Sequence, residues 1–294
     1  MNILQKYADF LPFTHKIPFE FSANGTIGVG GIAPIALFPQ DEQEMLQILS
    51  MLTERKLSFV VVGNLSNTLV AEGAIEHVVI CTKQMRFCRS YGRYLYAESG
   101  VTSGRLLHRC IDAGLSGAEF LSGVPCTLGG AVYMNAGVSG EYISSIVDSV
   151  RVFRDGKVQI VRKDDCEFSY KNSLFMHNND ILLGATLHLV QSSPLKVREE
   201  IARYHEKRAH LPIGKSLGCI FKNPDGQIAG RLIEGAGLKG MRIGGAVVSS
   251  VHANFIINDN GATAQDIRSL IQIIKNAVYA QYKIALQEEI RYLE

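Results

Sequence analysis

A glycine-rich stretch, residues 114–140, constrains the fold more than any other feature of the sequence. It reads GLSGAEFLSGVPCTLGGAVYMNAGVSG, and neither the period of 2 of a strand nor the period of 3.6 of a helix runs through it. Glycine permits positive φ angles and lets a ligand approach uncovered backbone amides, while Pro125 stiffens the turn between the glycines. The stretch predicts either a ligand-binding segment or a run of tight turns in a glycine-rich sheet protein.

The composition is that of an ordinary globular protein. The 294 residues suffice for two or three domains with sizeable cores, and 47% of them are hydrophobic and 20% charged. A formal net charge of +2 and the lack of a basic run argue against a nucleic-acid partner. Because no signal-peptide pattern and no bilayer-length apolar run is visible, we expect a cytoplasmic protein without a membrane partner.

Cysteine and histidine spacing gives no sign of a metal site. The six cysteines form no CxxC pair, and the eight histidines show no HxxxH or HxH spacing. A chain of this length needs no covalent staples. We therefore expect reduced thiols and no bound metal.

Residues 24–33 (NGTIGVGGIA) space Gly28, Gly30 and Ala33 as in a dinucleotide-binding fingerprint. That fingerprint requires a hydrophobic strand before it and a helix after it. Here polar residues precede the glycines and Pro34 follows them. A Rossmann fold is therefore rejected for this segment.

A helix from about Asp41 to Arg55 precedes a fully apolar strand at residues 59–62. The strand runs into a short polar loop: Gly63, Asn64, Leu65, Ser66 and Asn67. A loop of this kind after a strand suits phosphate binding through backbone amides and hydroxyls, although on its own it equally fits an ordinary turn.

Periodicity and turn residues order the rest of the chain. The expected elements are a strand at 78–81, a hairpin through Tyr91-Gly92, a helix capped by Thr102 or Ser103 and ending at Gly114, a hairpin at 150–161 around Asp155-Gly156, a strand at 181–190, a helix from Pro194 to about Arg208, a short helix at 228–234, a strand at 255–257 and a long helix capped by Thr263. The last hundred or so residues are expected to form a separate α+β unit.

Seven motifs in order give the chain a resemblance to a known family: VGNLSNTLV (62–70), GLSGAEFLSGVPCTLGGAVYMNAG (114–137), FSYKNS (168–173), GCIFKNP (218–224), AGLKG (236–240), HANFIIN (252–258) and LQEEIR (286–291). On these motifs it resembles the UDP-N-acetylenolpyruvoylglucosamine reductases (MurB). The short span between Ser173 and Cys219 resembles the compact subtype, which lacks an inserted substrate-covering loop.

The resemblance implies an α+β fold with a two-subdomain FAD-binding region of the vanillyl-alcohol-oxidase (PCMH) type and a C-terminal α+β substrate-binding domain. The implied boundaries are 1–85, 86–193 and 194–294, with residues 286–294 returning to the active site. The implied activity takes hydride from NADPH, the co-substrate, through non-covalent FAD to the enolpyruvyl double bond, giving UDP-N-acetylmuramate for peptidoglycan synthesis. A monomer acting on a nucleotide-sugar is expected.

The resemblance places Lys171, Cys219 and Glu289 in catalytic positions. Hydride addition leaves negative charge on the carbon conjugated to the carboxyl group, so a cation and a proton donor are needed. The family usually has arginine where Lys171 stands and serine where Cys219 stands. Lysine offers a point charge in place of a bidentate clamp, whereas a thiol, with a pKa near 8.5, is a better acid than an alcohol.

Binding residues are implied in the same way. For the cofactor they are Gly63, Asn64, Leu65, Ser66, Asn67, Gly123, Val124, Thr127, Gly129, Gly130 and Arg291; for the substrate they are Tyr170, Lys222 and Asn223. Leu65 and Cys126 stand where glycine is usual, which bears on how closely the backbone approaches the cofactor.

Two other functions stay open at this point. An oxidase of the vanillyl-alcohol type accounts for the first two-thirds of the chain but leaves the motifs GCIFKNP and LQEEIR unexplained. A non-enzymatic nucleotide-sugar-binding protein would tolerate the departures at Lys171, Leu65 and Cys126. Taken singly, Lys171, Cys219 and Glu289 are also typical of a surface lysine, a small buried hydrophobe and a solvated carboxylate.

Overall fold

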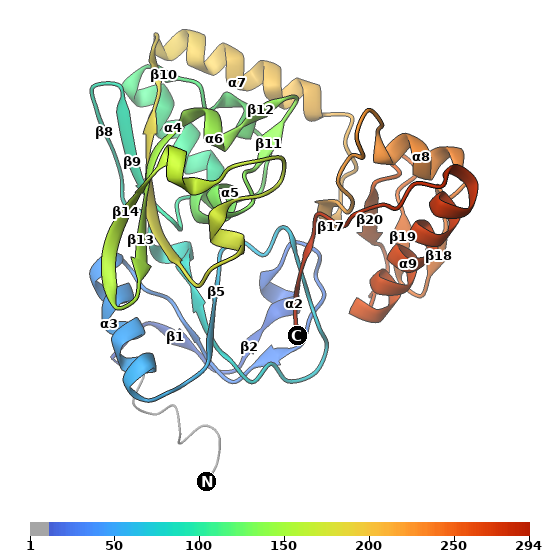
Figure 1. Cartoon of the computed structure of the whole chain (residues 1–294), viewed down its shortest axis with the longest axis horizontal. Coiled ribbons are helices and arrows are strands. Elements are labelled where there is room, and N and C mark those ends of the chain that lie inside the picture. The colour runs from blue at the N-terminus through green and yellow to red at the C-terminus, as the bar shows by residue number, and fades with distance from the viewer. Residues whose placement is uncertain (1–11) are drawn as a thin grey trace. The chain divides into compact units, whose positions relative to one another are not determined.

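A computed structural model describes residues 12–294 (Figure 1), and its chain divides into two compact units. Of the described residues, the first unit comprises 12–17, 35–64 and 77–209, and the second comprises 18–34, 65–76 and 210–294. The boundaries expected at 85 and 193 stay a prediction. Part of the N-terminal pattern considered above, residues 1–11, lies outside the described residues.

A four-stranded sheet, β1-β4-β7-β5, forms one part of the first unit; its strands are His15–Lys16, Ala36–Leu37, Val78–Cys81 and Phe59–Val62. Strand β7 runs parallel to both β4 and β5. Helix α3 (Glu42–Glu54) packs on this sheet through Met45, Ile48, Leu49 and Leu52, which are fully buried. The Asp41 carboxylate accepts from Glu44 N at 2.9 Å and begins the helix, as the sequence predicted.

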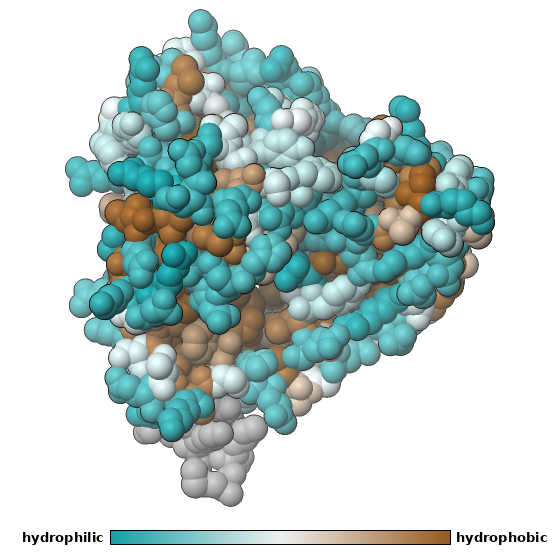
Figure 2. Space-filling model, viewed as in Figure 1, coloured by the Kyte–Doolittle hydropathy of each residue, from teal (hydrophilic) through white to brown (hydrophobic). Residues whose placement is uncertain are grey.

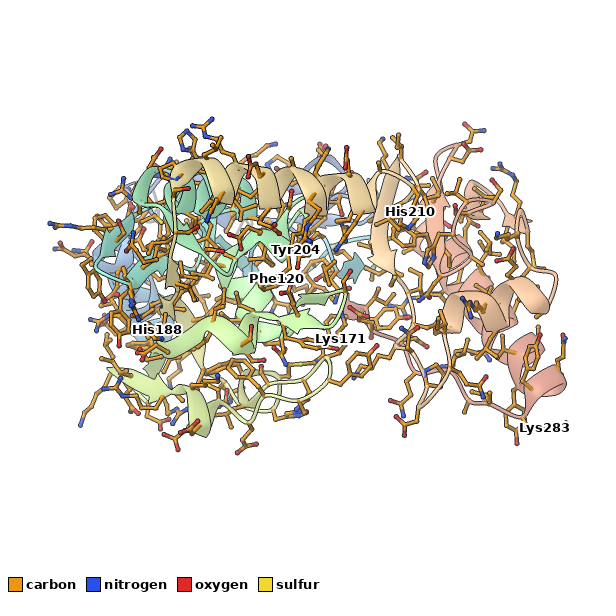
Figure 3. All side chains as sticks on the ribbon, turned by 90° about the horizontal axis from the view of Figure 1, so that it is seen from above. Phe120, Lys171, His188, Tyr204, His210 and Lys283 are labelled. Carbon is orange, nitrogen blue, oxygen red and sulfur yellow. The ribbon has the colours of Figure 1, made fainter. Side chains whose placement is uncertain are left out.

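A five-stranded antiparallel sheet, β14-β13-β15-β9-β8, forms the other part of the first unit. Its strands are Lys157–Arg162, Val147–Arg154, Ile181–His188, Tyr94–Glu98 and Cys88–Tyr91, and its helices are α4 (Ser103–Ala113), α5 (Leu128–Tyr133), α6 (Ile143–Ile146) and α7 (Pro194–Arg208). The predicted hairpin turn is confirmed, with positive φ at Asp155 and Gly156. One core joins these elements, and it includes Phe120 and Tyr204, labelled in Figure 3.

Two short antiparallel pairs complete the first unit. They are β10 (Leu115–Ser116) with β16 (Val190–Gln191), and β11 (Gly137–Val138) with β12 (Glu141–Tyr142). The strand expected at 181–190 therefore ends at His188, because β16 leaves the large sheet to pair with β10.

The second unit is built on an antiparallel sheet, β17-β20-β19-β18, of Lys215–Cys219, Phe255–Asn258, Ala246–Val248 and Arg242–Ile243. Helices α8 (Ala229–Gly235) and α9 (Ala264–Tyr282) pack on it. The predicted apolar face of α9 is buried, and Thr263 begins the helix with a capping box.

Two earlier stretches of the chain belong to this second unit, so the last hundred residues are not separate as expected. Ile27, Val29 and Leu69 lie in its core. Strand β6 (Thr68–Val70) pairs in parallel with β21 (Arg291–Leu293), and β2 (Phe19–Glu20) pairs with β3 (Ile32–Ala33) beside α2 (Phe21–Asn24). Strands of two or three residues are too short to show a period, which is why the sequence did not reveal them.

The rejection of a Rossmann fold at residues 24–33 is confirmed. Strand β3 follows the glycines, and the next regular element is β4, not a helix. A Cβ at Gly31 would lie 1.9 Å from Gly73 O, so this glycine permits close packing of two backbone segments.

The surface carries hydrophilic residues with hydrophobic groups among them on the face drawn in Figure 2. Within residues 12–294, no helix combines the length and the apolar character needed to cross a membrane. All six cysteines are free thiols, as predicted.

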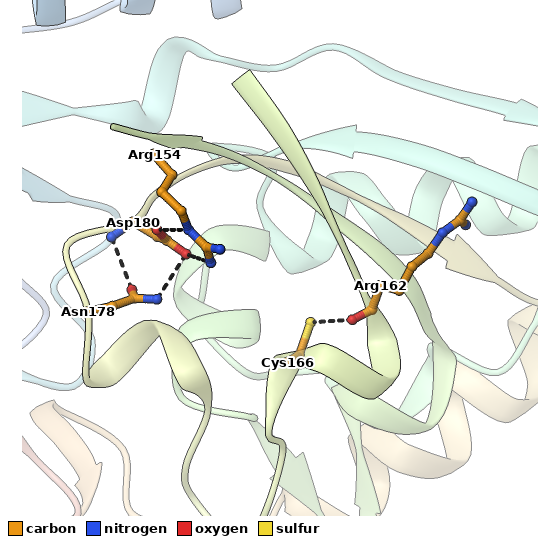
Figure 4. A network of polar contacts seen from close by, with 5 residues as sticks. All are labelled: Arg154, Arg162, Cys166, Asn178 and Asp180. Atoms are coloured by element: carbon orange, nitrogen blue, oxygen red, sulfur yellow. Dashed lines mark hydrogen bonds and ion pairs between the residues drawn. The ribbon is translucent and has the colours of Figure 1, made fainter. Parts of the chain in front are cut away.

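A buried ion pair fixes the loop that leads into β15 (Figure 4). Arg154 donates from Nε and Nη2 to the two oxygens of Asp180, at 2.7 and 2.5 Å, and the Asp180 side chain is 3% exposed. Asn178 donates from Nδ2 to the same carboxylate at 3.0 Å and accepts from Asp180 N. Nearby, Arg162 contacts Asp148 at 3.4 Å from a largely exposed position.

The two arginines of this hairpin should differ in their effect on stability. Arg154→Gln leaves a buried carboxylate without its bidentate partner and should lower the free energy of unfolding by about 2 kcal/mol. Arg162→Gln, the matched control, should change it by less than about 0.5 kcal/mol. Urea unfolding followed by circular dichroism measures both, and equal losses would contradict the assignment.

Candidate active site

The glycine-rich segment of the first unit is fixed by backbone hydrogen bonds to the connection between β9 and α4. Leu128 N donates to Val101 O and Gly129 N to Ser99 O, each at 2.8 Å. A Cβ at Gly129 would lie 2.8 Å from the Ser99 Cβ, so only glycine permits this approach. The backbone of this segment is therefore held in place by main-chain contacts.

Gly63 and Asn64, the end of the loop after β5 that belongs to the first unit, meet this segment. Asn64 donates from Nδ2 to Pro125 O at 2.8 Å. A Cβ at Gly63 would lie 2.4 Å from Thr127 Oγ1. Thr127 begins α5, and its hydroxyl accepts from Gly130 N at 3.4 Å. Two predicted cofactor-binding segments thus lie side by side in one unit.

The backbone donors of the loop after β5 fit a phosphate-bearing cofactor. Among the hydrogen bonds of residues 12–294, none uses a backbone N–H of residues 63–67 as donor. Gly123 and Gly130 are exposed, and Val124 is half-buried. A dinucleotide phosphate is bound by backbone N–H groups that have no other acceptor. Neighbouring glycines help because they have no side chain to keep the phosphate away. The residues present therefore fit FAD.

Leu65 and Cys126, the two residues expected to replace glycine, differ in how unfavourable their backbone conformation is. Leu65 adopts φ 53°, a left-handed conformation that costs a non-glycine residue about 1–2 kcal/mol. Its side chain is 6% exposed, so burial offsets part of that cost. Cys126 has no positive φ, and its carbonyl accepts from Ser103 N at 3.1 Å. Burial raises the pKa of the Cys126 thiol to about 12, which keeps it protonated at neutral pH.

Lys171, labelled in Figure 3, lies in the first unit on a tight turn that also holds Tyr170. Ser169 and Asn172 exchange backbone hydrogen bonds of 3.1 Å, and Lys171 takes φ 53°. Tyr170 is 43% exposed and packs edge-on against the Tyr142 ring, with centroids 6.4 Å apart. The turn presents the lysine and the tyrosine from one short, constrained loop.

Two polar side chains that the sequence did not single out as positioning residues hold this turn. Asn135 donates from Nδ2 to Ser169 O at 2.8 Å, and Ser173 donates from Oγ to Tyr133 O at 2.6 Å. Both residues are buried. Tyr133 ends α5, the helix that Thr127 begins, so the turn and the cofactor segment share one support.

Cys219 and Glu289 lie together in the second unit. Cys219 ends β17 opposite Phe255 of β20, and Glu289 N donates to Ile220 O at 2.8 Å. Lys222 N donates to Gln287 O at 2.8 Å, which continues the pairing. The segment 287–291 thus pairs with the GCIFKNP motif, and the return of residues 286–294 to the active site stays a prediction.

The two adjacent glutamates of LQEEIR have different surroundings. Glu288 accepts from Lys275 Nζ at 2.7 Å and from the Tyr292 hydroxyl at 2.5 Å. Burial opposes ionisation, but these hydrogen bonds outweigh it and lower the pKa of Glu288. Glu289 is half-buried, and its backbone is hydrogen-bonded to Ile220 O and to the Asn67 side chain.

The rest of the predicted cofactor loop, Leu65 to Asn67, is joined to the same returning segment in the second unit. Asn67 donates from Nδ2 to Glu289 O at 3.1 Å, and Arg291 N donates to Asn67 O at 2.9 Å. Arg291 then begins β21 beside Thr68 of β6. The predicted cofactor residues Asn67 and Arg291 and the predicted catalytic residue Glu289 are therefore neighbours.

Asn223 and Asn254 have structural partners within the second unit. Asn223 Oδ1 accepts from Ala229 N at 3.0 Å and so satisfies an amide at the start of α8. Asn254, which the sequence did not single out, accepts from Phe221 N at 2.9 Å and donates to Phe221 O at 2.8 Å. Asn254 is 3% exposed, and the sequence alone carried no signal of this long-range clamp.

Two family models match the chain. The FAD binding domain matches residues 33–162, and the C-terminal domain of UDP-N-acetylenolpyruvoylglucosamine reductase matches residues 208–293. Both ranges agree with the expected fold class, an FAD-binding region followed by a C-terminal α+β domain, and confirm it.

Curated relatives and a solved structure extend over nearly the whole chain. The UDP-N-acetylenolpyruvoylglucosamine reductase of Caldicellulosiruptor bescii is 35% identical over 274 residues, covering 91% of this chain and 87% of the relative. That of Geobacter metallireducens is 38% identical over 269 residues, covering 90% and 89%. The crystal structure of the reductase from Thermus caldophilus matches with a TM-score of 0.82 at 30% identity, covering 96% and 100%. The chain belongs to the UDP-N-acetylenolpyruvoylglucosamine reductase family.

Proposed function

We propose that the protein reduces the enolpyruvyl double bond of UDP-N-acetylglucosamine enolpyruvate, with NADPH as co-substrate, to UDP-N-acetylmuramate for peptidoglycan synthesis. The observation that carries this proposal is similarity at 35–38% identity to reductases of that name over nine-tenths of the chain. We further propose that it acts as a monomer in the cytoplasm, on a nucleotide-sugar and without nucleic-acid or membrane partners.

FAD, when bound, would supply the hydride. The residues proposed to hold it non-covalently are Gly63, Asn64, Leu65, Ser66, Asn67, Gly123, Val124, Thr127, Gly129, Gly130 and Arg291. The open amides of residues 63–67 support this role, because backbone N–H groups bind phosphate without a side-chain charge. The raised thiol pKa of Cys126 supports non-covalent binding, because a protonated thiol is a poor nucleophile.

Lys171 is proposed to stabilise the charge that develops on the substrate carboxylate. Its backbone lies on a turn that Asn135 anchors through Ser169 O. A fixed cation aimed at developing charge lowers the barrier because it needs little reorganisation during the reaction. Tyr170, from the same turn, and Lys222 and Asn223 of the second unit are proposed to bind the nucleotide-sugar.

Cys219 is proposed to deliver the proton to the substrate carbon, with Glu289 stabilising the same position. Support comes from their backbones, since Glu289 N is bonded to the residue that follows Cys219. The asparagine clamp on Phe221 fixes the strand end from the other direction. A proton donor needs this positional control because transfer requires a hydrogen-bond distance.

The function is tested with the flavin-loaded protein under argon. We expect NADPH to bleach the flavin spectrum and UDP-N-acetylglucosamine enolpyruvate to restore it, with UDP-N-acetylmuramate as product. Restoration by air alone would favour an oxidase, and a colourless protein that retains no added FAD would favour a nucleotide-sugar-binding role.

Lys171→Met should slow reoxidation of the reduced flavin by substrate about 100-fold, the typical effect of losing one electrostatic stabiliser. Reduction by NADPH should change little, and Lys171→Arg should retain activity. Stopped-flow absorbance separates the two half-reactions. Equal losses in both would instead indicate a defect in folding or cofactor binding.

Cys219→Ala should leave reduction of the flavin by NADPH nearly intact and slow its reoxidation by substrate by orders of magnitude. Cys219→Ser should restore much of the rate, because a hydroxyl can occupy the donor position. Thiol alkylation should inactivate the parent protein but not the serine variant. If the alanine variant turns over at the parental rate, the proton comes from another group, and Glu289 is the next to replace.

A further inference from the structure

A groove of about 550 Å³ lies between α4 and α7 of the first unit. The two helices run antiparallel, because Ser192 N, just before α7, donates to Gly114 O, just after α4. At the opposite end, the loop Ser122–Pro125 closes the groove. Ser103 of α4 donates from Oγ to Val124 O at 2.6 Å, which holds that loop against the start of the helix.

The middle of the groove is apolar. Leu107 and Ile111 lie one turn apart on α4, and Ile201 faces them from α7. Val124 and Pro125 add apolar surface from the loop. A volume of this size is within the range of small-molecule sites in proteins, about 300–1,000 Å³.

Polar groups without partners line the end nearest the loop. Ser122 is 4% exposed, yet within residues 12–294 its hydroxyl makes no hydrogen bond. Gly104, in the first turn of α4, has an amide that donates to no described group, and a Cβ there would meet nothing within 4 Å. The Ser122 hydroxyl is not one of the fully buried polar atoms that lack a partner, so it is open to the groove and can bind a ligand there.

Arg198 is the one arginine or lysine that lines the groove within the described residues. Arg198 of α7 forms no ion pair or hydrogen bond with any described residue. On α4, His108 lies 3.3 Å from the Asp112 carboxylate. A guanidinium beside an apolar floor selects an anion that carries an apolar body.

We propose that this groove binds a small amphipathic anion, with its acidic group at Arg198, its apolar body between Leu107 and Ile201, and a polar end at Ser122. Charge complementarity and the unpartnered hydroxyl at the far end favour this class over a neutral or cationic ligand. No residue of the proposal needs a contact from the second unit.

Fluorescence of 1-anilinonaphthalene-8-sulfonate, a sulfonate with an aromatic body, tests the site in the flavin-loaded protein. Arg198→Gln should weaken binding about tenfold, because a charge-assisted contact is lost. Gly104→Leu should abolish it by filling the open space, and its flavin content and melting temperature should match the parent. Arg203→Gln, a matched control on the same helix whose guanidinium pairs with Glu200, should change the dissociation constant less than twofold.

Competition identifies the class of ligand. Decanoate should displace the probe, whereas inorganic phosphate, which lacks an apolar body, should not. The proposal is overturned if Arg198→Gln and Gly104→Leu bind the probe as the parent does. It is also overturned if the probe binds only to flavin-free protein and FAD displaces it, because the probe then occupies the cofactor segments.

Discussion

The close backbone contact between residues 99–103 and residues 126–129 is the constraint on which the first unit's site depends. Three main-chain hydrogen bonds join these segments, and one of them requires that residue 129 carry no Cβ. Thr127 can then begin α5 while its hydroxyl lies against Gly63. Main-chain contacts leave side chains uninvolved, so the segment tolerates Cys126 in place of glycine.

In the second unit, the site segments are also held in place, but by an asparagine side chain as well as by main-chain pairing. Its site segments are held from both sides: the asparagine clamp fixes Phe221, and the returning segment 287–291 pairs with residues 220–222 and with Asn67. Glu288 and Glu289 illustrate the outcome. Lys275 of α9 pairs with the Glu288 carboxylate, whereas the backbone of Glu289 is hydrogen-bonded to Ile220 and Asn67.

Much of this structure was predictable from the residues because local rules determine it. The 3.6 period and polar caps gave α3 and α9, and the pair Asp155-Gly156 gave the hairpin. The tertiary supports were not predictable. Strands β2 and β3 have two residues each, and no local pattern shows that residues 18–34 and 65–76 join the second unit. The left-handed conformation of Leu65 is imposed by the loop and opposes the residue's own preference.

For the site, too, the local features were predictable and the tertiary contacts were not. The motifs allowed the candidate residues to be named, but their supports, Asn135, Ser173 and Asn254, are recognisable only once their partners are known. Each is a buried polar side chain whose partner lies on another stretch of the chain. Composition and periodicity carry no information about such long-range pairing.

The second unit is assembled from three stretches that are far apart in sequence, and this has a consequence for folding. Contacts between distant residues form slowly because a long loop must close before they become favourable. Strand β6 is made early in synthesis, yet its partner β21 emerges more than two hundred residues later. Residues 65–70 therefore lack their pairing strand during most of translation. Helix α3 and its sheet, in contrast, can pack as soon as residues 35–81 have been synthesised.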